Sequence, residues 1–193
     1  MTAAFSFPYG VAIDANNNLY VSDSGTSRIR KITPAGVVTT LAGGGAGAGS
    51  ADGAAGVAQF NLPTGLAVDG AGNVYVADLN NDRIRKVTPA GVVSTLAGST
   101  GGFTDGTGAA AQFNDPYGVA VDGAGNILVA DTLNRVIRKV TAAGVVTTFA
   151  GATNGFVDGV GTAARFGFVN GIAIDSAGTI YVADGNNALR RIK

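Results

Sequence analysis

Short stretches of apolar residues, several of them alternating with polar ones, recur along the whole chain and are separated by turns rich in glycine and proline. In one complete unit, residues 65–69 predict a first strand, 73–78 a second, 83–88 a third and 92–97 a fourth. The turn at 70–72 (Gly-Ala-Gly) has the composition of a tight hairpin with positive φ, and 89–91 (Pro-Ala-Gly) that of a second turn. Each unit is therefore expected to form a small antiparallel sheet.

The same unit occurs four times. The sequences YGVAID, TGLAVD, YGVAVD and NGIAID contain Gly10, Gly65, Gly118 and Gly171, at intervals of 55, 53 and 53 residues. A second aspartate follows nine residues after each motif, and a basic cluster comes next. We expect a single domain over 1–193, with repeats at about 5–43, 60–98, 113–151 and 166–193 joined by Gly/Ala-rich loops at 44–59, 99–112 and 152–165.

The second strand of each unit is apolar on both faces. In residues 73–78, Val74 and Val76 lie on one face while Tyr75 and Ala77 lie on the other. Sheets of about four strands, packed face to face around an axis, would cover both faces. The fold class is therefore all-β, a β-propeller with one blade per repeat. The third strand does not alternate cleanly, since Ile84 and Val87 are three positions apart, and this predicts a bulge or a twisted outer strand.

The motifs of the second copy resemble the NHL repeat. They read Pro63-x-Gly-Leu-Ala-Val-Asp69, then Gly72-Asn-Val-Tyr-Val-Ala-Asp78, then Asn80 and Arg83-Ile. The resemblance extends over all four copies, although the fourth has Val169 where the others have proline. It implies a propeller, commonly six-bladed, so four repeats are fewer than the family pattern.

The fourth repeat ends after its third strand, so we expect about fifteen blade strands rather than sixteen. Four blades would form a half-propeller with two apolar faces left uncovered, and such faces drive association. The chain could be a fragment of a larger propeller, or two chains could associate, and the favoured partner is a second copy of the chain. A homodimer of two half-rings would complete one ring of eight blades, and a different protein partner is the other expectation.

Composition removes several kinds of chemistry. The chain has no cysteine, histidine or tryptophan, which excludes disulfides, Cys/His zinc sites and catalytic triads. Because 13 basic residues balance 13 acidic ones, DNA and RNA are disfavoured as partners. The first residues lack a signal-peptide pattern, and no stretch is long and apolar enough to insert into a membrane. The compartment is left open.

Twelve of the thirteen basic residues lie in or at the third strands. They could bind RNA, as some NHL propellers do, or they could pair with aspartates of the same or the next blade. We favour pairing, with the arginine stems covering tyrosines. The arginines are Arg30, Arg85, Arg138 and Arg190, and the tyrosines are Tyr20, Tyr75 and Tyr181.

Each segment between repeats contains an Asp-Gly pair eight residues before a phenylalanine. The pairs are Asp52 and Phe60, Asp105 and Phe113, and Asp158 and Phe166. The motif could form a binding loop or a cation site. We favour a turn followed by a short helical turn, with the phenylalanine anchored between blades.

A non-enzymatic scaffold or binding module, acting by protein–protein contact or self-assembly, is the favoured function. Asp23, Asp78, Asp131 and Asp184 could instead line one mouth of the ring and hold calcium. NHL-like lactonases use such metals, but with histidine-type ligands that this chain lacks, so a calcium-dependent lactonase-like hydrolase is an alternative. An RNA-binding propeller is another. Candidate ligand-binding residues lie in the turns after the second strands: Asn80, Asn81, Asp82, Asn134, Arg135, Asn186 and Asn187.

Overall fold

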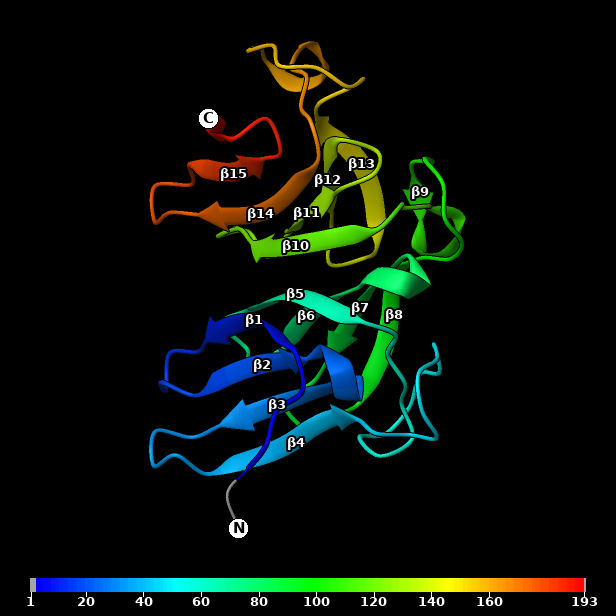
Figure 1. Ribbon diagram of the computed structural model, residues 1–193, viewed down its shortest axis with the longest axis vertical. Coiled ribbons are helices and arrows are strands. Elements are labelled where there is room, and N and C mark those ends of the chain that lie inside the picture. Colours follow the sequence, from blue (N-terminus) through cyan, green and yellow to red (C-terminus); the bar gives the residue numbers. More distant parts are fainter. Residues whose placement is uncertain (1–2, 193) are drawn as a thin grey trace.

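Four antiparallel sheets surround a common axis in the computed structural model, which describes residues 3–192 (Figure 1). Blade 1 contains β1 (Pro8–Ile13), β2 (Leu19–Asp23), β3 (Arg28–Ile32) and β4 (Val38–Gly43). Blade 2 contains β5 (Pro63–Val68), β6 (Val74–Asp78), β7 (Arg83–Val87) and β8 (Val93–Gly98). Blade 3 contains β10 (Pro116–Val121), β11 (Ile127–Asp131), β12 (Val136–Val140) and β13 (Val145–Ala150), and blade 4 contains β14 (Val169–Ile174), β15 (Ile180–Asp184) and β16 (Ala188–Ile192).

Consecutive strands are neighbours in every sheet, so each blade is a meander. The two-residue β9 (Gly106–Thr107) adds a fifth strand to blade 3 beside β13. Four short 3-10 turns complete the elements: η1 (Ser24–Thr26), η2 (Leu79–Asn81), η3 (Gly108–Ala110) and η4 (Gly161–Ala163). The expectation of a propeller whose last blade lacks its outer strand is confirmed for the residues described.

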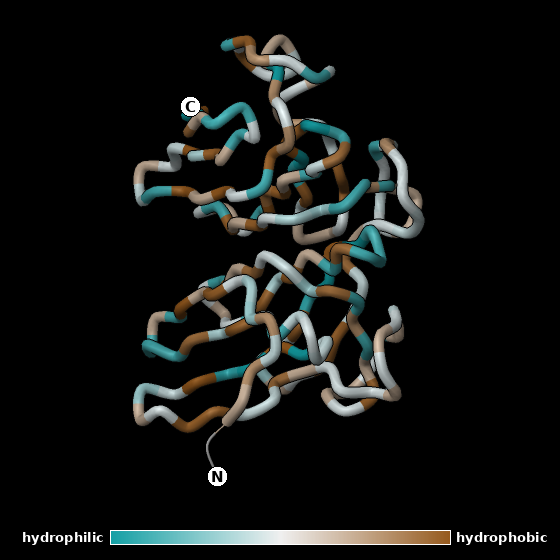
Figure 2. The backbone as a smooth tube through the Cα atoms, in the orientation of Figure 1, coloured by the Kyte–Doolittle hydropathy of each residue, from teal (hydrophilic) through white to brown (hydrophobic). Residues whose placement is uncertain are grey.

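Apolar side chains from facing blades form three separate cores. Val74 and Val76 of β6 pack against blade 1, whereas Tyr75 and Ala77 pack against blade 3. Figure 2 shows the corresponding brown segments in the strands and teal segments at many of the turns. Both faces of β6 are therefore covered by neighbouring blades, as its apolar pattern on both faces predicted.

The expected irregularity is a β-bulge between the third and fourth strands. The register between β7 and β8 shifts after Ile84, and β3 and β12 show the same shift against their outer strands. The extra residue lies in the fourth strand, at Leu96, while β7 keeps a continuous register with β6. Ile84 and Val87 are three positions apart in β7 and therefore lie on opposite faces, toward blade 3 and blade 1. The phenylalanine anchors are also confirmed, because Phe60, Phe113 and Phe166 are almost completely buried.

The four inner strands lie side by side along the axis in the order β1, β5, β10, β14. A glycine occupies the point of closest approach. A Cβ atom added at Gly65 would lie 2.5 Å from the Tyr117 carbonyl oxygen, and one at Gly10 would lie 2.5 Å from that of Thr64. At Gly118 the obstructing atom is the Asn170 carbonyl oxygen. Glycine is needed here because the backbone of the next blade fills the space of a side chain.

The substitution Gly65→Ala is expected to lower the free energy of unfolding by about 2–3 kcal/mol, since backbone atoms of β10 must move away from the new methyl group. Gly70→Ala is the matched control in the same blade, because no atom lies within 4 Å of its added Cβ. Urea denaturation followed by circular dichroism measures both. Equal effects of the two substitutions would contradict the proposed role of close packing.

Candidate functional site

In blades 2, 3 and 4, a buried arginine is bound by two aspartates. In blade 2, Arg85 Nη1 donates to Asp78 Oδ2 at 2.6 Å, and Nη2 donates to Asp52 Oδ1 at 2.7 Å. Two carbonyl oxygens of the preceding segment, those of Ala51 and Gln59, accept further hydrogen bonds from the guanidinium at 3.0 Å. The arginine therefore ties the segment between the blades to the strands of blade 2.

The same network recurs in blades 3 and 4. Arg138 binds Asp131 and Asp105, and Arg190 binds Asp184 and Asp158. Blade 1 differs: within the described residues, Arg30 pairs with one aspartate, Asp23, at 3.5 Å, donates to the Ala4 carbonyl oxygen at 3.3 Å and lies 5.3 Å from the Phe5 ring centroid. The expected pairing of these arginines with aspartates is confirmed. The Asp-Gly pair proves to be more than a turn, because its carboxylate binds the arginine.

The prediction that arginine stems cover the tyrosines was wrong for Tyr20 and Tyr75, because a lysine lies over each of these rings. Lys31 Nζ lies 5.6 Å from the Tyr20 ring centroid, because β pairing places these two residues opposite each other. Lys86 is placed over Tyr75 in the same way. The arginines instead lie over phenylalanines, with Arg85 5.2 Å from the Phe60 ring centroid.

Burial of the strand-end aspartates does not create an accessible acid. Burial raises the pKa of Asp131 to about 6, against the lowering effect of hydrogen bonds from Asn134, Asn114 and Arg138. The pKa of Asp78 is also raised, by the same cause. Both residues have no exposed surface, so no substrate could exchange a proton with them in the folded blade. Their perturbed titration belongs to a structural ion pair.

A second set of aspartates caps the turns between the first and second strands. Asp14 accepts hydrogen bonds from the Asn18 amide and side chain, both at 2.8 Å, and from the Tyr20 hydroxyl at 3.0 Å. Asp69 and Asp122 accept the same amide and side-chain bonds from Asn73 and Asn126. Asp175 accepts a hydrogen bond from the Thr179 amide at 2.9 Å and a longer one from the Tyr181 hydroxyl at 3.3 Å. The carboxylates stabilise tight turns, as short polar side chains commonly do.

These hydrogen bonds predict a pH-dependent stability. The bond from the Asn18 side chain, followed by other donors that outweigh burial, lowers the pKa of Asp14 from 3.8 to about 2. The stabilisation is therefore complete above about pH 4 and is lost as the pH falls toward 2. The penalty of Asp14→Ala in denaturation experiments is expected to shrink over that range. Asn16→Ala, a neutral change in the same turn, should give a penalty that does not vary with pH.

Three of the candidate ligand-binding residues have structural hydrogen bonds. The side-chain amides of Asn81, Asn134 and Asn186 donate to the carbonyl oxygens of Gly49, Gly102 and Gly155, at 2.8, 2.8 and 3.0 Å. Each also donates to the aspartate at the end of its own second strand. The turns after the second strands therefore lie against the long segments, and these three amides hold them together.

The other four candidates also lie in these turns. Asp82, Arg135 and Asn187 have φ near +55° to +60° and end the turns in left-handed conformation. Asp82 accepts the Asp115 amide at 3.0 Å, Arg135 lies 4.9 Å from the Phe168 ring centroid, and the Asn80 side chain donates to Asn61. The structure does not bring the seven residues to one pocket, and their role in ligand binding stays a prediction.

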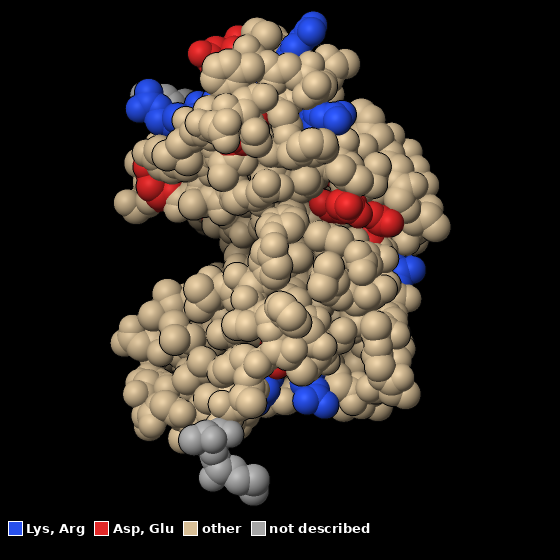
Figure 3. Space-filling view, viewed as in Figure 1, with Lys and Arg blue, Asp and Glu red and all other residues tan. Residues whose placement is uncertain are grey.

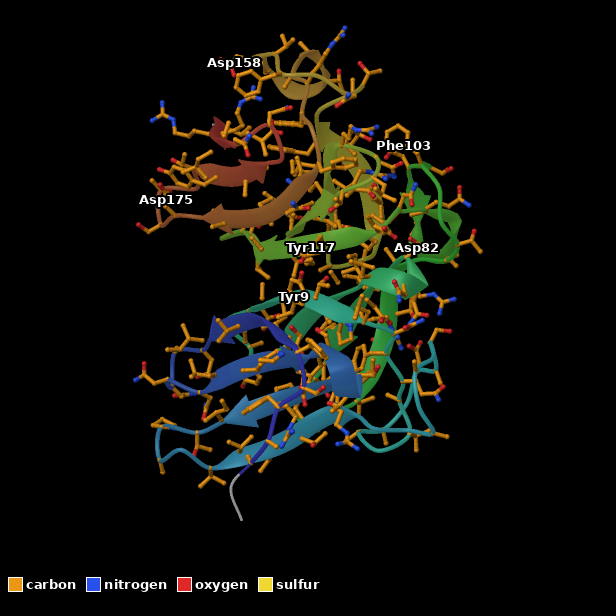
Figure 4. The ribbon with its side chains drawn as sticks, in the orientation of Figure 1. Tyr9, Asp82, Phe103, Tyr117, Asp158 and Asp175 are labelled. Atoms are coloured by element: carbon orange, nitrogen blue, oxygen red, sulfur yellow. The ribbon has the colours of Figure 1, made fainter. Side chains whose placement is uncertain are left out.

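The ring has a hollow at one end of its axis. A cavity of about 560 Å³ is lined by the turns that contain Asp69, Asp122 and Asp175, and Figure 3 shows a hollow between the two halves of the molecule. At the other end, the rings of Tyr9 and Tyr117 meet edge to face, with centroids 5.3 Å apart (Figure 4). Burial, together with a hydrogen bond involving Tyr9, raises the pKa of Tyr117.

Metal binding receives no support from side-chain convergence. Among the described residues, no three acidic side chains gather in a group that could hold a metal ion. The aspartates around the hollow already accept hydrogen bonds within their own turns. In the same part of the chain, no helix is long and apolar enough to cross a membrane.

Blade 1 exposes the apolar residues of its inner strand. Along β1, Tyr9, Val11 and Ile13 are 58%, 65% and 57% exposed, and Phe7, just before the strand, is 80% exposed. Their counterparts in β10 include Val119 and Val121, which pack in the core between blades 2 and 3. We call the side of blade 1 that presents Tyr9, Val11 and Ile13 its free face. The sequence implied an uncovered face, and comparison of equivalent positions in the repeats identifies these residues.

Blade 4 has a free face of the opposite kind. Here we use the term for the side that presents Gly171, Ala173, Tyr181, Ala183 and Leu189. Leu189, the equivalent of the buried Ile84 in blade 2, is 73% exposed. A Cβ atom added at Gly171 would have only the Ala183 Cβ atom nearby, at 3.4 Å. The position that is filled by the next blade at Gly10, Gly65 and Gly118 is therefore open.

Four meander sheets around one axis define a β-propeller. Residues 5–32 and 60–87 match the family model for the NHL repeat. The chain is thus an NHL-repeat β-propeller, as the resemblance of its motifs implied.

Named relatives support the same family. The chain is 33% identical to "Protein SUPPRESSOR OF QUENCHING 1, chloroplastic" of Arabidopsis thaliana over 150 residues, which cover 72% of the chain and 14% of that protein. It is 34% identical to "NHL repeat-containing protein 2" of Gallus gallus over 158 residues, covering 70% of the chain and 21% of the relative. The chain thus spans a small part of the length of both relatives.

Solved structures share the fold. A structural genomics protein of unknown function from Bacteroides thetaiotaomicron has a TM-score of 0.78 and 26% identity, with 95% of this chain matching 46% of that one. A gluconolactonase from Xanthomonas campestris has a TM-score of 0.60 and 15% identity, with 94% of this chain matching 71% of that one. At 15% identity the likeness concerns the fold alone.

Proposed function

We propose that the chain is a non-enzymatic propeller scaffold that acts by binding a polypeptide at the free face of blade 1. The observation that supports this is the exposed apolar row of Tyr9, Val11 and Ile13, whose counterparts in other blades are covered by a neighbour. Contiguous exposed apolar residues are unusual on the surface of a monomeric protein and indicate an interaction site.

The polar residues support a structural role rather than catalysis. The buried aspartates bind arginines or turn amides, and the exposed turn aspartates have their hydrogen bonds within the turn. The sequence offers no histidine or cysteine as a base or nucleophile. RNA binding is also poorly supported, because Arg85 and Arg138 are fully buried and cannot reach a phosphate.

A calcium-dependent hydrolase is the competing function, and the hollow ringed by Asp69, Asp122 and Asp175 is the place to test it. We expect added calcium or a chelator to leave the melting temperature unchanged within about 1 °C, since a ligand stabilises the folded state only if it binds there. A rise of several degrees that Asp122→Asn abolishes would favour a calcium site over the scaffold.

Site-specific photocrosslinking tests the scaffold directly. A photoreactive amino acid at position 11 is expected to form a covalent adduct with a polypeptide in the cells that produce the protein. The control is position 37, a valine on the turn between β3 and β4 that is 55% exposed, against 65% for Val11. Mass spectrometry identifies the adduct. If position 11 gives no more adduct than position 37, the proposed function is wrong.

A further inference from the structure

We propose that the free face of blade 4 binds blade 1 of a second copy of the chain, and that the reciprocal contact closes a two-chain ring of eight blades. The inference rests on the proposed function and names its polypeptide partner. It requires the two free faces to be complementary, and three features of the structure support that complementarity.

The first feature is the backbone packing along the axis. The carbonyl oxygens of Thr64, Tyr117 and Asn170 each pack against the glycine of the preceding blade. Gly171 has the same position in blade 4, but its space is open. Tyr9 has the position of Tyr117 in blade 1 and has no preceding blade among the described residues. The Tyr9 carbonyl of one copy therefore fits the vacant space at Gly171 of the other.

The second feature is the agreement of side chains with an interface that already exists within the chain. On blade 2, Ala67, Tyr75, Ala77 and Ile84 cover blade 3. The equivalent positions of blade 4 hold Ala173, Tyr181, Ala183 and Leu189, so three of the four are identical.

The side chains of the blade 1 free face also resemble those that blade 3 presents to blade 2. Blade 3 presents Val119, Val121, Ile127 and Val129 to blade 2. Blade 1 has Val11, Ile13, Leu19 and Val21 at those positions, all of them aliphatic. The contact between copies would therefore reproduce the packing between blades 2 and 3, which makes the chain's own first blade a better fit than an unrelated peptide.

The third feature is the position of the charged side chains on the two free faces. On blade 4, Arg191 lies opposite Tyr181, just as Lys86 lies opposite Tyr75 on the blade 2 face that covers blade 3. On blade 1, Arg30 lies opposite Val21, just as the buried Arg138 lies opposite Val129. The charges on the free faces therefore occupy the same positions as those of the existing interface.

The experiment measures the mass of the purified chain by light scattering on a size-exclusion column. The wild type is expected to show twice the mass of one chain. Gly171→Val blocks the blade 4 face, and Val11→Lys places a charge on the blade 1 face, so each variant alone is expected to be monomeric. Val37→Lys, on an exposed turn away from both faces, should remain dimeric.

Mixing the two monomeric variants tests the head-to-tail arrangement. The Val11→Lys chain keeps an intact blade 4 face, and the Gly171→Val chain keeps an intact blade 1 face. One of the two contacts can then form, so a 1:1 heterodimer is expected, with a dissociation constant above that of the wild type. Native mass spectrometry detects it. Circular dichroism and melting temperature establish that both variants fold, and Gly171→Ser and Val11→Thr replace any variant that does not.

A monomeric wild type would overturn the inference, as would a dimer that survives both substitutions or a mixture that stays monomeric. These failures are distinct from failure of the proposed function. A wild-type monomer whose position 11 still crosslinks to a different protein would leave the scaffold standing without the second copy. No crosslink from position 11 and no dimer would remove both.

Discussion

Replacement of Arg138 by methionine is expected to lower the free energy of unfolding by about 3–5 kcal/mol, the range for breaking a buried ion pair from one side. The guanidinium has no exposed surface and donates to Asp131 at 2.9 Å and to Asp105 at 2.6 Å. It also donates to the carbonyl oxygens of Gln112 and Thr104. Methionine fills much of the volume but leaves the Asp131 carboxylate buried without its cation.

Arg30→Met is the matched control for this prediction. Its side chain is 13% exposed, its single ion pair is 3.5 Å long, and no second carboxylate reaches it among the described residues. We expect about 1 kcal/mol or less, as for a weak pair near the surface. Urea denaturation of both variants gives the comparison. The ion-pair explanation fails if Arg138→Met costs no more than Arg30→Met.

Replacement of Phe113 by alanine is the second large effect, also expected at about 3–5 kcal/mol. The ring is completely buried in the core between blades 2 and 3, and the Arg138 guanidinium lies 5.3 Å from its centroid. Its removal leaves a cavity that the rigid strands on either side cannot close. The expected result is a lower urea midpoint with a nearly unchanged slope.

Phe103→Ala separates the cavity from the cation–π contact. The Phe103 ring lies 5.0 Å from the same guanidinium, but the residue is 54% exposed. Its replacement is expected to cost under about 1 kcal/mol, the value of an exposed cation–π contact. Similar losses for both phenylalanines would mean that the contact with Arg138, rather than the buried volume, determines the stability.

Much of the fold could be predicted because its signals are local. The hairpin glycines Gly72 and Gly91 adopt φ of +81°, as the turn compositions required. The two-sided apolar pattern of β6 indicated cover by two neighbouring blades, and the odd spacing of Ile84 and Val87 in β7 reflects the same burial of both faces. Each of these inferences depends on residues a few positions apart, where backbone geometry alone decides the outcome.

The long-range contacts were harder to predict. The ion pair of Asp52 with Arg85 joins residues 33 positions apart, and the Asn81 amide reaches Gly49 across 32 positions. A signal was nevertheless present, since Asp105 and Arg138 repeat the 33-residue spacing. The cover of Tyr20 by Lys31 rather than arginine depended on the register between β2 and β3, which the apolar pattern alone does not define.

The segment before each blade has a consequence for how such propellers can be recombined. Asp52 and Phe60 precede the first strand of blade 2, yet both are held by Arg85 on its third strand. A transferable module therefore begins near residue 44 rather than at Pro63. A gene duplication or a graft that started at Pro63 would deliver a blade whose central arginine has lost one carboxylate and its aromatic neighbour. Exchange between propellers should succeed at junctions placed directly after a fourth strand.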